Sequence, residues 1–409
     1  MAGCQRATGK VVVIGGGFAG AAAAKALKEF DRRLDVVLID PQLNYVLAPG
    51  SNLALAGERT VESLTVNLDR LRDVGIAVMH EVVMEVDSDR CLLRTSRNTV
   101  VTFDYLIVAS GASANFEAVS GYVRASISEI PHAWWPGDET RHLKRLIELV
   151  PAGGTVLICP ATGPVRGPAA PYERASLIAH RLAQINPRAK VLILDPRETF
   201  PMQSLFQDLW RERYGGMVEW TGGVNHKIAR VDPLTRAVVT DFGDTFHADV
   251  INLIPPQRAA EVTASTGLRD RAGWCPVDHA SFESLLRPGI HVIGDGADLD
   301  PLPKTATAAI AEARIAAAAV VAKLSGREPD RNPQIQCAIQ ALGAPDVGFS
   351  IRQTFAIKNG KWSVADTELS PRQADAALRK READDHLEWI AKTAQSLWGP
   401  EDGGSATAT

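Results

Sequence analysis

The 409-residue sequence lacks several features that would place it in a special class. It has no apolar run near the roughly 20 residues of a transmembrane helix. Its formal net charge of −4 provides no basic field, so nucleic acid and anionic membrane surfaces are poor partners. Its nine histidines include no HExxH and no paired spacing, so we predict no metal site.

The sequence is also poor in cysteine. The five cysteines are Cys4, Cys91, Cys159, Cys275 and Cys337. None belongs to a CxxC pair, and no CxxCH string is present to attach a c-type haem, so a haem or metal would have to sit in another chain. The first nine residues carry no apolar signal region. We therefore expect any export signal to be missing here, with Met1 either at the stub of a cleaved precursor or at an ordinary start.

The first forty residues have the pattern of one strand–helix–strand unit. A β-branched run predicts a buried strand at Lys10–Ile14, an alanine-rich stretch predicts a helix at Ala21–Phe30, and a second strand is predicted at Asp35–Ile39. A GxGxxG string at residues 15–20 forms the first turn, and Asp40 ends the second strand. With all of these features in register, the pattern indicates a dinucleotide-binding unit.

Each of these residues has a physical reason to be there. Gly15 permits the tight turn, Gly17 lets a pyrophosphate approach the backbone, and Gly20 lets the helix pack on the strand. The helix N-terminus offers free N–H groups and a partial positive charge to the phosphates. Asp40, 20 residues after Gly20, is placed to accept hydrogen bonds from ribose hydroxyls.

More strands are predicted between this unit and the middle of the chain. They lie at Ile76–Glu85, Val100–Thr102 and Asp104–Gly111. The third ends in small residues, Ala109 and Gly111 among them, which would let the chain pass close to a cofactor. An ordinary strand followed by a tight turn is the alternative interpretation.

A later strand, Gly289–Asp295, ends in Gly-Asp and precedes an alanine-rich helix at Thr305–Leu324. Asp295 is placed to hydrogen-bond a polyol chain, and the helix N-terminus to face a flavin and stabilise its anionic reduced form. A simple turn aspartate is the alternative. The remaining residues that we expect to contact the cofactor are Phe18, Ala19, Val83, Gly294, Lys304 and Thr305.

A second α/β pattern occupies the middle of the chain. Strands are predicted at Gly154–Cys159 and Lys190–Leu194, with a helix at Tyr172–Gln184 between them. The connecting loop, Pro160–Pro171, has four prolines and no GxGxxG, so it lacks N–H donors for phosphates. We infer a dinucleotide-type domain without NAD, and we expect Asp249–Ile254 to be a buried strand that returns to the first domain.

Beyond Pro329 the pattern changes. Short strands are predicted around Val347–Thr354 and Trp362–Val364, followed by a charged amphipathic helix at Ala374–Trp398 whose many charges argue against a membrane anchor. The polar tail, Pro400–Thr409, is expected to be disordered.

The predicted fold class is α/β, with two Rossmann-like dinucleotide-binding domains and a small α+β C-terminal domain. The first, FAD-binding domain is discontinuous and covers residues 1–115 and 245–327. The NAD-like domain covers 116–244, and the C-terminal interface domain covers 328–409. This layout, with Gly-Asp at 294–295, is similar to that of the flavin disulfide reductase-like group.

Within that group the sequence resembles the flavoprotein subunit of flavocytochrome c sulfide dehydrogenase, from Val11 to about Gly399. Four strings carry the resemblance, at residues 131–134 (PHAW), 171–176 (PYERAS), 249–258 (DVINLIPPQR) and 272–278 (AGWCPVD). The resemblance implies a periplasmic FAD enzyme that pairs with a c-type cytochrome. It also implies sulfide oxidation through a redox disulfide over a flavin that is tethered to a cysteine.

The sequence departs from this family at two of its cysteines. Ala48 stands at the flavin-tethering position and Gly167 at the first redox position, whereas the resemblance assigns the second redox cysteine to Cys337. Whether Cys159 approaches Cys337 is left open. The resemblance also assigns an active-site base to Glu173. Its alternative is a first-turn glutamate favoured by the helix dipole.

Trp389 matches an aromatic residue that the family places near the flavin, with a buried helix tryptophan as the alternative. Cys337, Glu173 and Trp389 are therefore the candidate catalytic residues, with FAD bound non-covalently.

Three functions remain open. One is an FAD subunit that passes electrons from a sulfur compound to a cytochrome c. Another is an altered dehydrogenase that kept the fold and the cytochrome partner but lost sulfide chemistry. The third is a non-catalytic FAD-binding partner in an electron-transfer complex. The changes at Ala48 and Gly167 favour the second slightly over strict sulfide oxidation.

Overall fold

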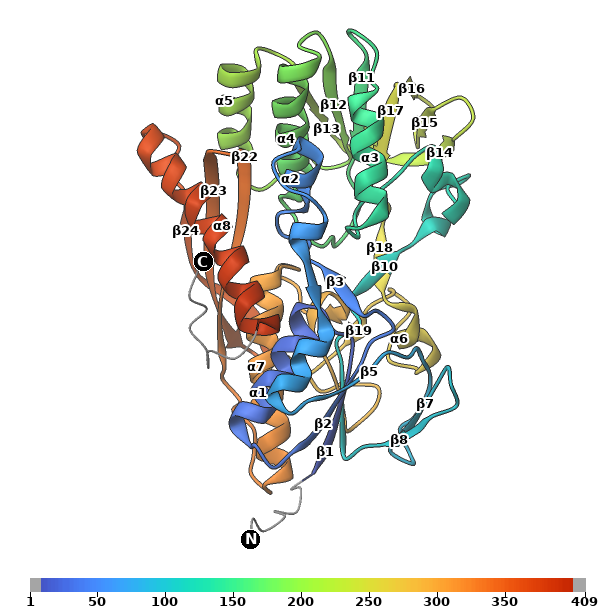
Figure 1. Ribbon diagram of the computed structural model, residues 1–409, viewed down its shortest axis with the longest axis vertical. Coiled ribbons are helices and arrows are strands. Elements are labelled where there is room, and N and C mark those ends of the chain that lie inside the picture. The colour runs from blue at the N-terminus through green and yellow to red at the C-terminus, as the bar shows by residue number, and fades with distance from the viewer. Residues whose placement is uncertain (1–8, 400–409) are drawn as a thin grey trace, which may run out of the picture.

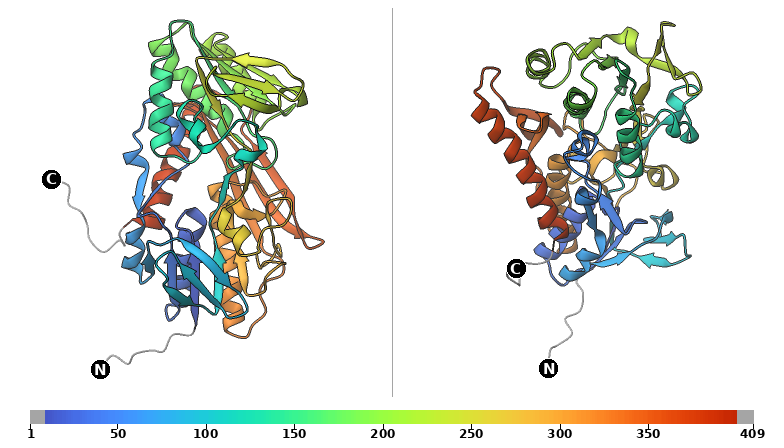
Figure 2. Two further views of the ribbon diagram at one scale, coloured as in Figure 1. Left: turned by 90° about the vertical axis from the view of Figure 1, so that its right-hand side faces the viewer. Right: turned by 45° about the horizontal axis from the view of Figure 1, so that its top comes forward.

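The computed structural model describes residues 9–399, so Cys4 and the tail at 400–409 lie outside the described residues. Two α/β units stand end to end, and a C-terminal layer runs along both of them (Figure 1). Figure 2 shows the same layer from two further sides, with its strands and last helix beside both units. The C-terminal layer therefore lies against both units at the place where they meet.

The first unit is built on a five-stranded parallel sheet in the order β20-β9-β1-β2-β5. Its strands are β1 (Lys10–Ile14), β2 (Asp35–Ile39), β5 (Ala77–Met79), β9 (Tyr105–Val108) and β20 (Ile290–Val292). Helices α1 (Phe18–Phe30) and α7 (Ala306–Leu324) pack against one another, since their alanine-rich faces allow close approach. Valine and isoleucine fill the strands because β-branched side chains suit a sheet that is covered on both faces.

The predicted strand at Ile76–Glu85 is wrong as a single element. It divides into β5 and β6 (Val83–Asp87), and β6 joins a separate antiparallel sheet with β7 (Leu92–Thr95) and β8 (Val100–Thr102). His80 lies at the break, with Nδ1 2.9 Å from the Gln42 carbonyl and Nε2 3.0 Å from Asp69. These bonds hold the chain where it leaves the parallel sheet.

The second unit has a four-stranded parallel sheet in the order β13-β12-β11-β17. Its strands are β11 (Thr155–Cys159), β12 (Lys190–Asp195), β13 (Val218–Gly222) and β17 (Val250–Leu253), and its helices are α3 (Asp138–Glu148), α4 (Ala170–Ile185) and α5 (Gln203–Tyr214). The predicted return of Asp249–Ile254 to the first domain is wrong, because β17 pairs with β11.

The chain returns slightly later than predicted. Strand β18 (Gln257–Ala259) pairs antiparallel with β10 (Ala112–Ala114), and these two segments connect the units (Figure 1). The segment 245–254, which we had assigned to the FAD-binding domain, therefore lies in the second unit. The remaining short elements are β3 (Asn44–Val46), α2 (Ser51–Ala56), β4 (Thr65–Asn67), β14 (Ile228–Asp232), β15 (Ala237–Thr240), β16 (Thr245–His247), α6 (Glu261–Ser265), β19 (Cys275–Pro276) and β21 (Ala297–Asp298).

The C-terminal layer is a three-stranded antiparallel sheet and one helix. Its elements are β22 (Gln334–Ala344), β23 (Val347–Lys358), β24 (Lys361–Leu369) and α8 (Ala376–Trp398), so the strands are longer than predicted and β22 was missed. Ile335 and Cys337 on β22 join the core of the first unit, whereas Ile339 and Ala341 join that of the second. Strand β22 thus fastens both units together. Within residues 9–399, no helix is long and apolar enough to cross a membrane.

Candidate functional site

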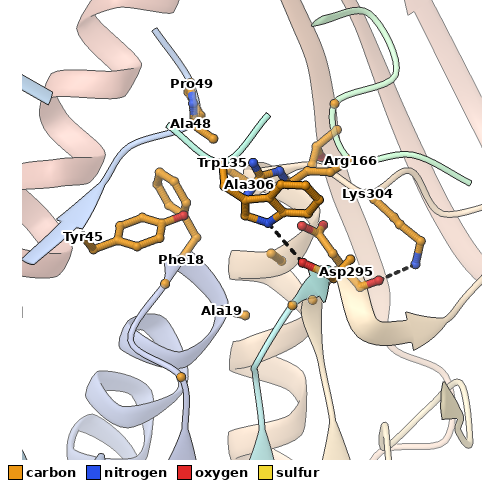
Figure 3. A pocket seen from close by; sticks show the side chains of 18 of the residues that line it. Phe18, Ala19, Tyr45, Ala48, Pro49, Trp135, Arg166, Asp295, Lys304 and Ala306 are labelled. Carbon is orange, nitrogen blue, oxygen red and sulfur yellow. Dashed lines mark hydrogen bonds between the residues drawn. The ribbon is translucent and has the colours of Figure 1, made fainter. Parts of the chain in front are cut away.

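A cavity of about 560 Å³ lies where the two units and the C-terminal layer meet (Figure 3). Its volume is in the range of small-molecule and cofactor sites. It is lined by fourteen of the residues predicted from the sequence, namely Gly15, Gly17, Phe18, Ala19, Asp40, Val83, Ala109, Gly111, Glu173, Gly294, Asp295, Lys304, Thr305 and Trp389. Of the sixteen predicted site residues, Gly20 and Cys337 do not line it.

One end of the cavity is formed by the glycine turn and α1. Gly15 has φ +103°, and a Cβ there would lie 2.4 Å from the Ala109 carbonyl oxygen, so this position requires glycine. Gly17 begins α1 without a side-chain cap, which leaves the first N–H groups of the helix free for an anion. Asp40 accepts hydrogen bonds from the Gly16 and Gln42 amides at 2.7 and 2.8 Å, so its carboxylate is fixed at the cavity wall.

Gly20 acts by packing rather than by contact with a ligand. A Cβ on Gly20 would lie 1.8 Å from the Gly15 carbonyl oxygen, so the helix and the turn touch through this residue. This agrees with the task predicted for Gly20, which is to let the helix pack closely, and Gly20 serves the cofactor site through the turn and does not line the cavity itself.

A second wall comes from the loop before α7. Lys304 Nζ donates to the carbonyls of Asp295 and Ala297 at 2.7 and 2.8 Å and lies 4.1 Å from the centre of the Trp274 ring. Thr305 caps α7, with its hydroxyl accepting from the Ala308 amide at 3.2 Å. The first turn of α7 lines the cavity and presents the positive end of the helix dipole. Together with the glycine turn, these residues fit FAD.

Glu312, one turn and a half into α7, was missed by the sequence analysis. Its carboxylate accepts from the Gly294 amide at 2.6 Å and it is 3% exposed, and this burial raises its pKa to about 7. The signal was present in the sequence, since Glu312 is a lone acid within a helix of alanines. The hydrogen bond to Gly294 therefore connects Glu312 on α7 to the Gly294–Asp295 loop.

Glu173 lies on the opposite wall, in the first turn of α4. Its two carboxyl oxygens accept from Asn52 Nδ2 at 2.7 Å and from the Leu342 amide at 2.9 Å, and burial raises its pKa. The carboxyl therefore joins α2, α4 and β22 while also lining the cavity. Trp389 on α8 stacks at 6.4 Å on Phe18 and brings the C-terminal layer to the same cavity.

No cysteine within residues 9–399 lines the cavity. Cys337 is placed by the structure in the core of the first unit, where burial raises its pKa to about 12, and Ile339, two residues further along β22, lines the cavity instead. Cys159 belongs to another core cluster, so the two thiols are free and are not brought together. Gly167 and Ala48 do line the cavity.

Gly167 has a backbone conformation that disfavours a side chain. Its φ is +62°, and a Cβ would lie 3.2 Å from the Ala170 Cβ. Its amide donates to the Lys304 carbonyl at 2.8 Å, which joins the second unit to the loop before α7. Gly167→Cys would therefore place a thiol at the cavity, but Cys337 does not line the cavity with it.

In the second unit, the acid that corresponds to Asp40 is already hydrogen-bonded to other side chains. Asp195 ends β12, where an NAD-binding domain would hold a ribose, but the Tyr172 hydroxyl, the Trp220 indole and the Arg197 side chain already donate to it. Phe200 stacks on Tyr172 with ring centres 3.7 Å apart. Asp195 is fully buried, so its carboxylate is not available to a ribose.

We therefore expect NADH and NADPH to reduce bound FAD at no useful rate. The measurement is an anaerobic stopped-flow record of the flavin absorbance after mixing with either nucleotide. Rapid bleaching at micromolar NADH would show that the second unit still binds a nucleotide despite the buried Asp195 carboxylate.

Comparisons with known proteins agree with this architecture. Residues 140–255 match the family profile of the central part of the sulfide dehydrogenase (flavocytochrome c) flavoprotein chain, and residues 9–137 match that of pyridine nucleotide-disulphide oxidoreductases. The flavocytochrome c flavoprotein chain of Chlorobaculum thiosulfatiphilum is 47% identical over 45 residues, which are 11% of this chain and 94% of that sequence.

Longer matches are more distant. The sulfide-quinone reductase of Aquifex aeolicus is 25% identical over 388 residues, which are 86% of this chain and 87% of that protein. The X-ray structure of the sulfide:quinone oxidoreductase from the same organism superposes with a TM-score of 0.74 at 20% identity, covering 97% of this chain and 93% of that one. The fold is thus that of the disulfide-oxidoreductase-like flavoproteins.

Proposed function

We propose that this chain, an FAD-dependent oxidoreductase related to the sulfide:quinone oxidoreductases and the flavocytochrome c sulfide dehydrogenases, oxidises a small donor directly at FAD. No redox disulfide takes part in this proposal. The electrons then pass to a c-type cytochrome. A sulfur compound is the first donor to test, because the relatives named above act on sulfide.

The observation that carries the proposal is a cofactor-sized cavity without a thiol. The chemistry that FAD would supply when bound is to take up two electrons from one donor and pass them singly to two equivalents of a one-electron acceptor. Among residues 9–399 no cysteine lines the cavity, so in this proposal no disulfide is available for a donor to attack and the donor reacts with the cofactor itself.

The chain's own residues have defined tasks in this proposal. Trp134 and Trp135 line one side of the cavity. Glu173, whose pKa is raised by burial, is placed to hold a proton released by the donor. Gly167 also lines the cavity and takes up no side-chain space there.

Two observations support the cytochrome as the electron acceptor. The flavoprotein chain of a flavocytochrome c is among the relatives, and the family profile of that subunit covers most of the second unit. This partner implies an export route, so we also propose a periplasmic location. Detection of the protein in the cytoplasmic fraction of its host would contradict the location without affecting the chemistry.

The central test is anaerobic reduction of the flavin. We expect at least one of sulfide, small thiols and sulfite to bleach the flavin of the purified protein, and the reduced protein to reduce a soluble cytochrome c faster than a soluble quinone. Cys337→Ser should leave the bleaching rate unchanged, because Cys337 does not line the cavity. A rate lost in Cys337→Ser would contradict direct reaction at FAD, and no bleaching by any donor would favour the non-catalytic electron-transfer partner.

We further expect FAD to be bound without a covalent link. Ala48 lines the cavity and offers no sulfur to the flavin methyl carbon, and none of the described residues that line the cavity is a cysteine. Acid precipitation should therefore release the yellow chromophore into the supernatant. A yellow pellet that keeps its absorbance after washing would overturn this prediction.

A further inference from the structure

Two neighbouring tryptophans that line the cavity, Trp134 and Trp135, each stack against the guanidinium group of an arginine. The guanidinium of Arg174 lies over the Trp134 ring at 4.9 Å from its centre, and that of Arg166 lies over the Trp135 ring at 5.4 Å. The Arg166 guanidinium also donates to the Trp134 carbonyl. All four residues line the cavity, and Figure 3 shows Arg166 beside Trp135 and apart from Phe18 and Ala19.

Arg174 is a buried charge without an acidic partner in contact. It is 2% exposed, and no carboxylate lies within 4 Å of it among the described residues. Its N–H groups donate only to neutral oxygens, which belong to Asn52, His132, Ala133 and Asn252 at 2.7–3.0 Å. A buried charge is normally paired with an acid in direct contact, and Arg174 lacks such a partner.

Acids lie near this end of the cavity, but none forms an ion pair with either arginine among the described residues. Burial raises the pKa of Glu173, which favours its neutral form. Glu139 lies 2.8 Å from His132 Nδ1 and accepts from the Ala133 amide at 2.8 Å, and it acts on Arg174 only at longer range. Both guanidinium groups therefore line the cavity without a carboxylate in contact.

Arg166 has free donors. Apart from the bond to Trp134, its side chain has no hydrogen bond or ion pair within residues 9–399, so Nε and Nη1 remain available. Stacking on Trp135 fixes the plane of the guanidinium, whose parallel N–H groups match two oxygens of one anion. The first-unit glycine turn, by contrast, supplies the place for the cofactor's phosphates.

We propose that the cavity binds a small oxyanion, a sulfur oxyanion or a carboxylate, on the free N–H groups of Arg166, and that the donor belongs to this class. The statement that this anion is the electron donor rests on the proposed function. The existence of the binding site rests only on the contacts of Arg166, Arg174 and the two tryptophans. The oxyanion supplies an anion in direct contact with Arg166, which no carboxylate of the described residues does.

The test measures binding without turnover. The FAD-saturated, oxidised protein is titrated calorimetrically with sodium sulfate and with sodium acetate at a fixed ionic strength. We expect one binding site for at least one of them, and the stronger ligand identifies the sulfur-oxyanion or the carboxylate source. Arg166→Gln should weaken that binding about tenfold to a hundredfold, and Arg97→Gln, an exposed arginine in the turn after β7, should leave it unchanged.

Each remaining outcome is decisive. Arg166→Lys keeps the charge but loses the paired N–H donors, so it should bind the oxyanion several-fold more weakly than the parent. This variant also provides the test if Arg166→Gln does not fold. No binding of either salt, or equal binding by all variants, overturns the inference. Loss of FAD from the Arg166 variants overturns it as well, since the arginine would then serve the cofactor. Failure of the proposed function is seen separately, as a flavin that no donor bleaches.

Discussion

Gly20→Ala is expected to unfold the first unit locally and abolish FAD binding. A Cβ at this position would lie 1.8 Å from the Gly15 carbonyl oxygen, which is backbone and has no flexible side chain to move aside. Relief requires that α1 shift away from the turn, at a cost of about 3 kcal/mol. The shift would also misplace the N–H groups of the turn that face the phosphates. Urea unfolding and the ratio of flavin to protein absorbance measure the two effects.

Gly17→Ala is the matched control. Gly17 has φ −71°, which alanine adopts without strain, and its added Cβ would make ordinary contacts of 3.5 Å with Tyr45. This variant should therefore keep its stability but bind FAD more weakly, because the methyl group enters the cavity beside the helix N-terminus. If both variants bind FAD as the parent does, the assignment of the glycine turn to the cofactor is wrong.

The first unit was predictable because its signals are local. The valines of β1 and β2, the glycines between them and Asp40 at the end of β2 all lie within about 30 residues, and both strands begin and end where the sequence indicated. The helix after Thr305 was predicted to within one residue for the same reason, since a threonine cap precedes a run of alanines.

The predictions that were wrong concern residues whose positions depend on contacts distant in sequence. The periodicity of β22 gave no indication that its side chains change from one core to the other, so nothing in the string around Cys337 showed that Ile339 and not the cysteine lines the cavity. Asp249–Ile254 was correctly predicted to be buried, but burial alone does not say which of two parallel sheets a strand joins. The Arg166–Trp135 contact joins residues 31 positions apart and has no sequence signature.

The second prediction with a large effect concerns Glu312 and pH. Its pKa is about 7 in the folded protein, since it is buried under the Gly294–Asp295 loop, and near 4.5 when exposed. The folded state therefore binds more protons between these two values, and the stability that Glu312 contributes is present below about pH 4.5 and lost as the pH rises through 7. The loss amounts to about 3 kcal/mol at pH 8.

Glu312→Gln should remove this dependence. Glutamine keeps a carbonyl oxygen for the Gly294 amide but has no charge to bury, so the variant should gain stability on the parent as the pH rises from 5 to 8. Urea unfolding of the FAD-saturated proteins at several pH values gives the difference. Glu29→Gln is the control with the opposite sign, because the exposed Arg314 ion pair lowers the pKa of Glu29 and its contribution is lost as the pH falls. Parallel curves for the parent and Glu312→Gln would show that Glu312 stays ionised in the folded protein, with Lys304 as the cation that compensates it.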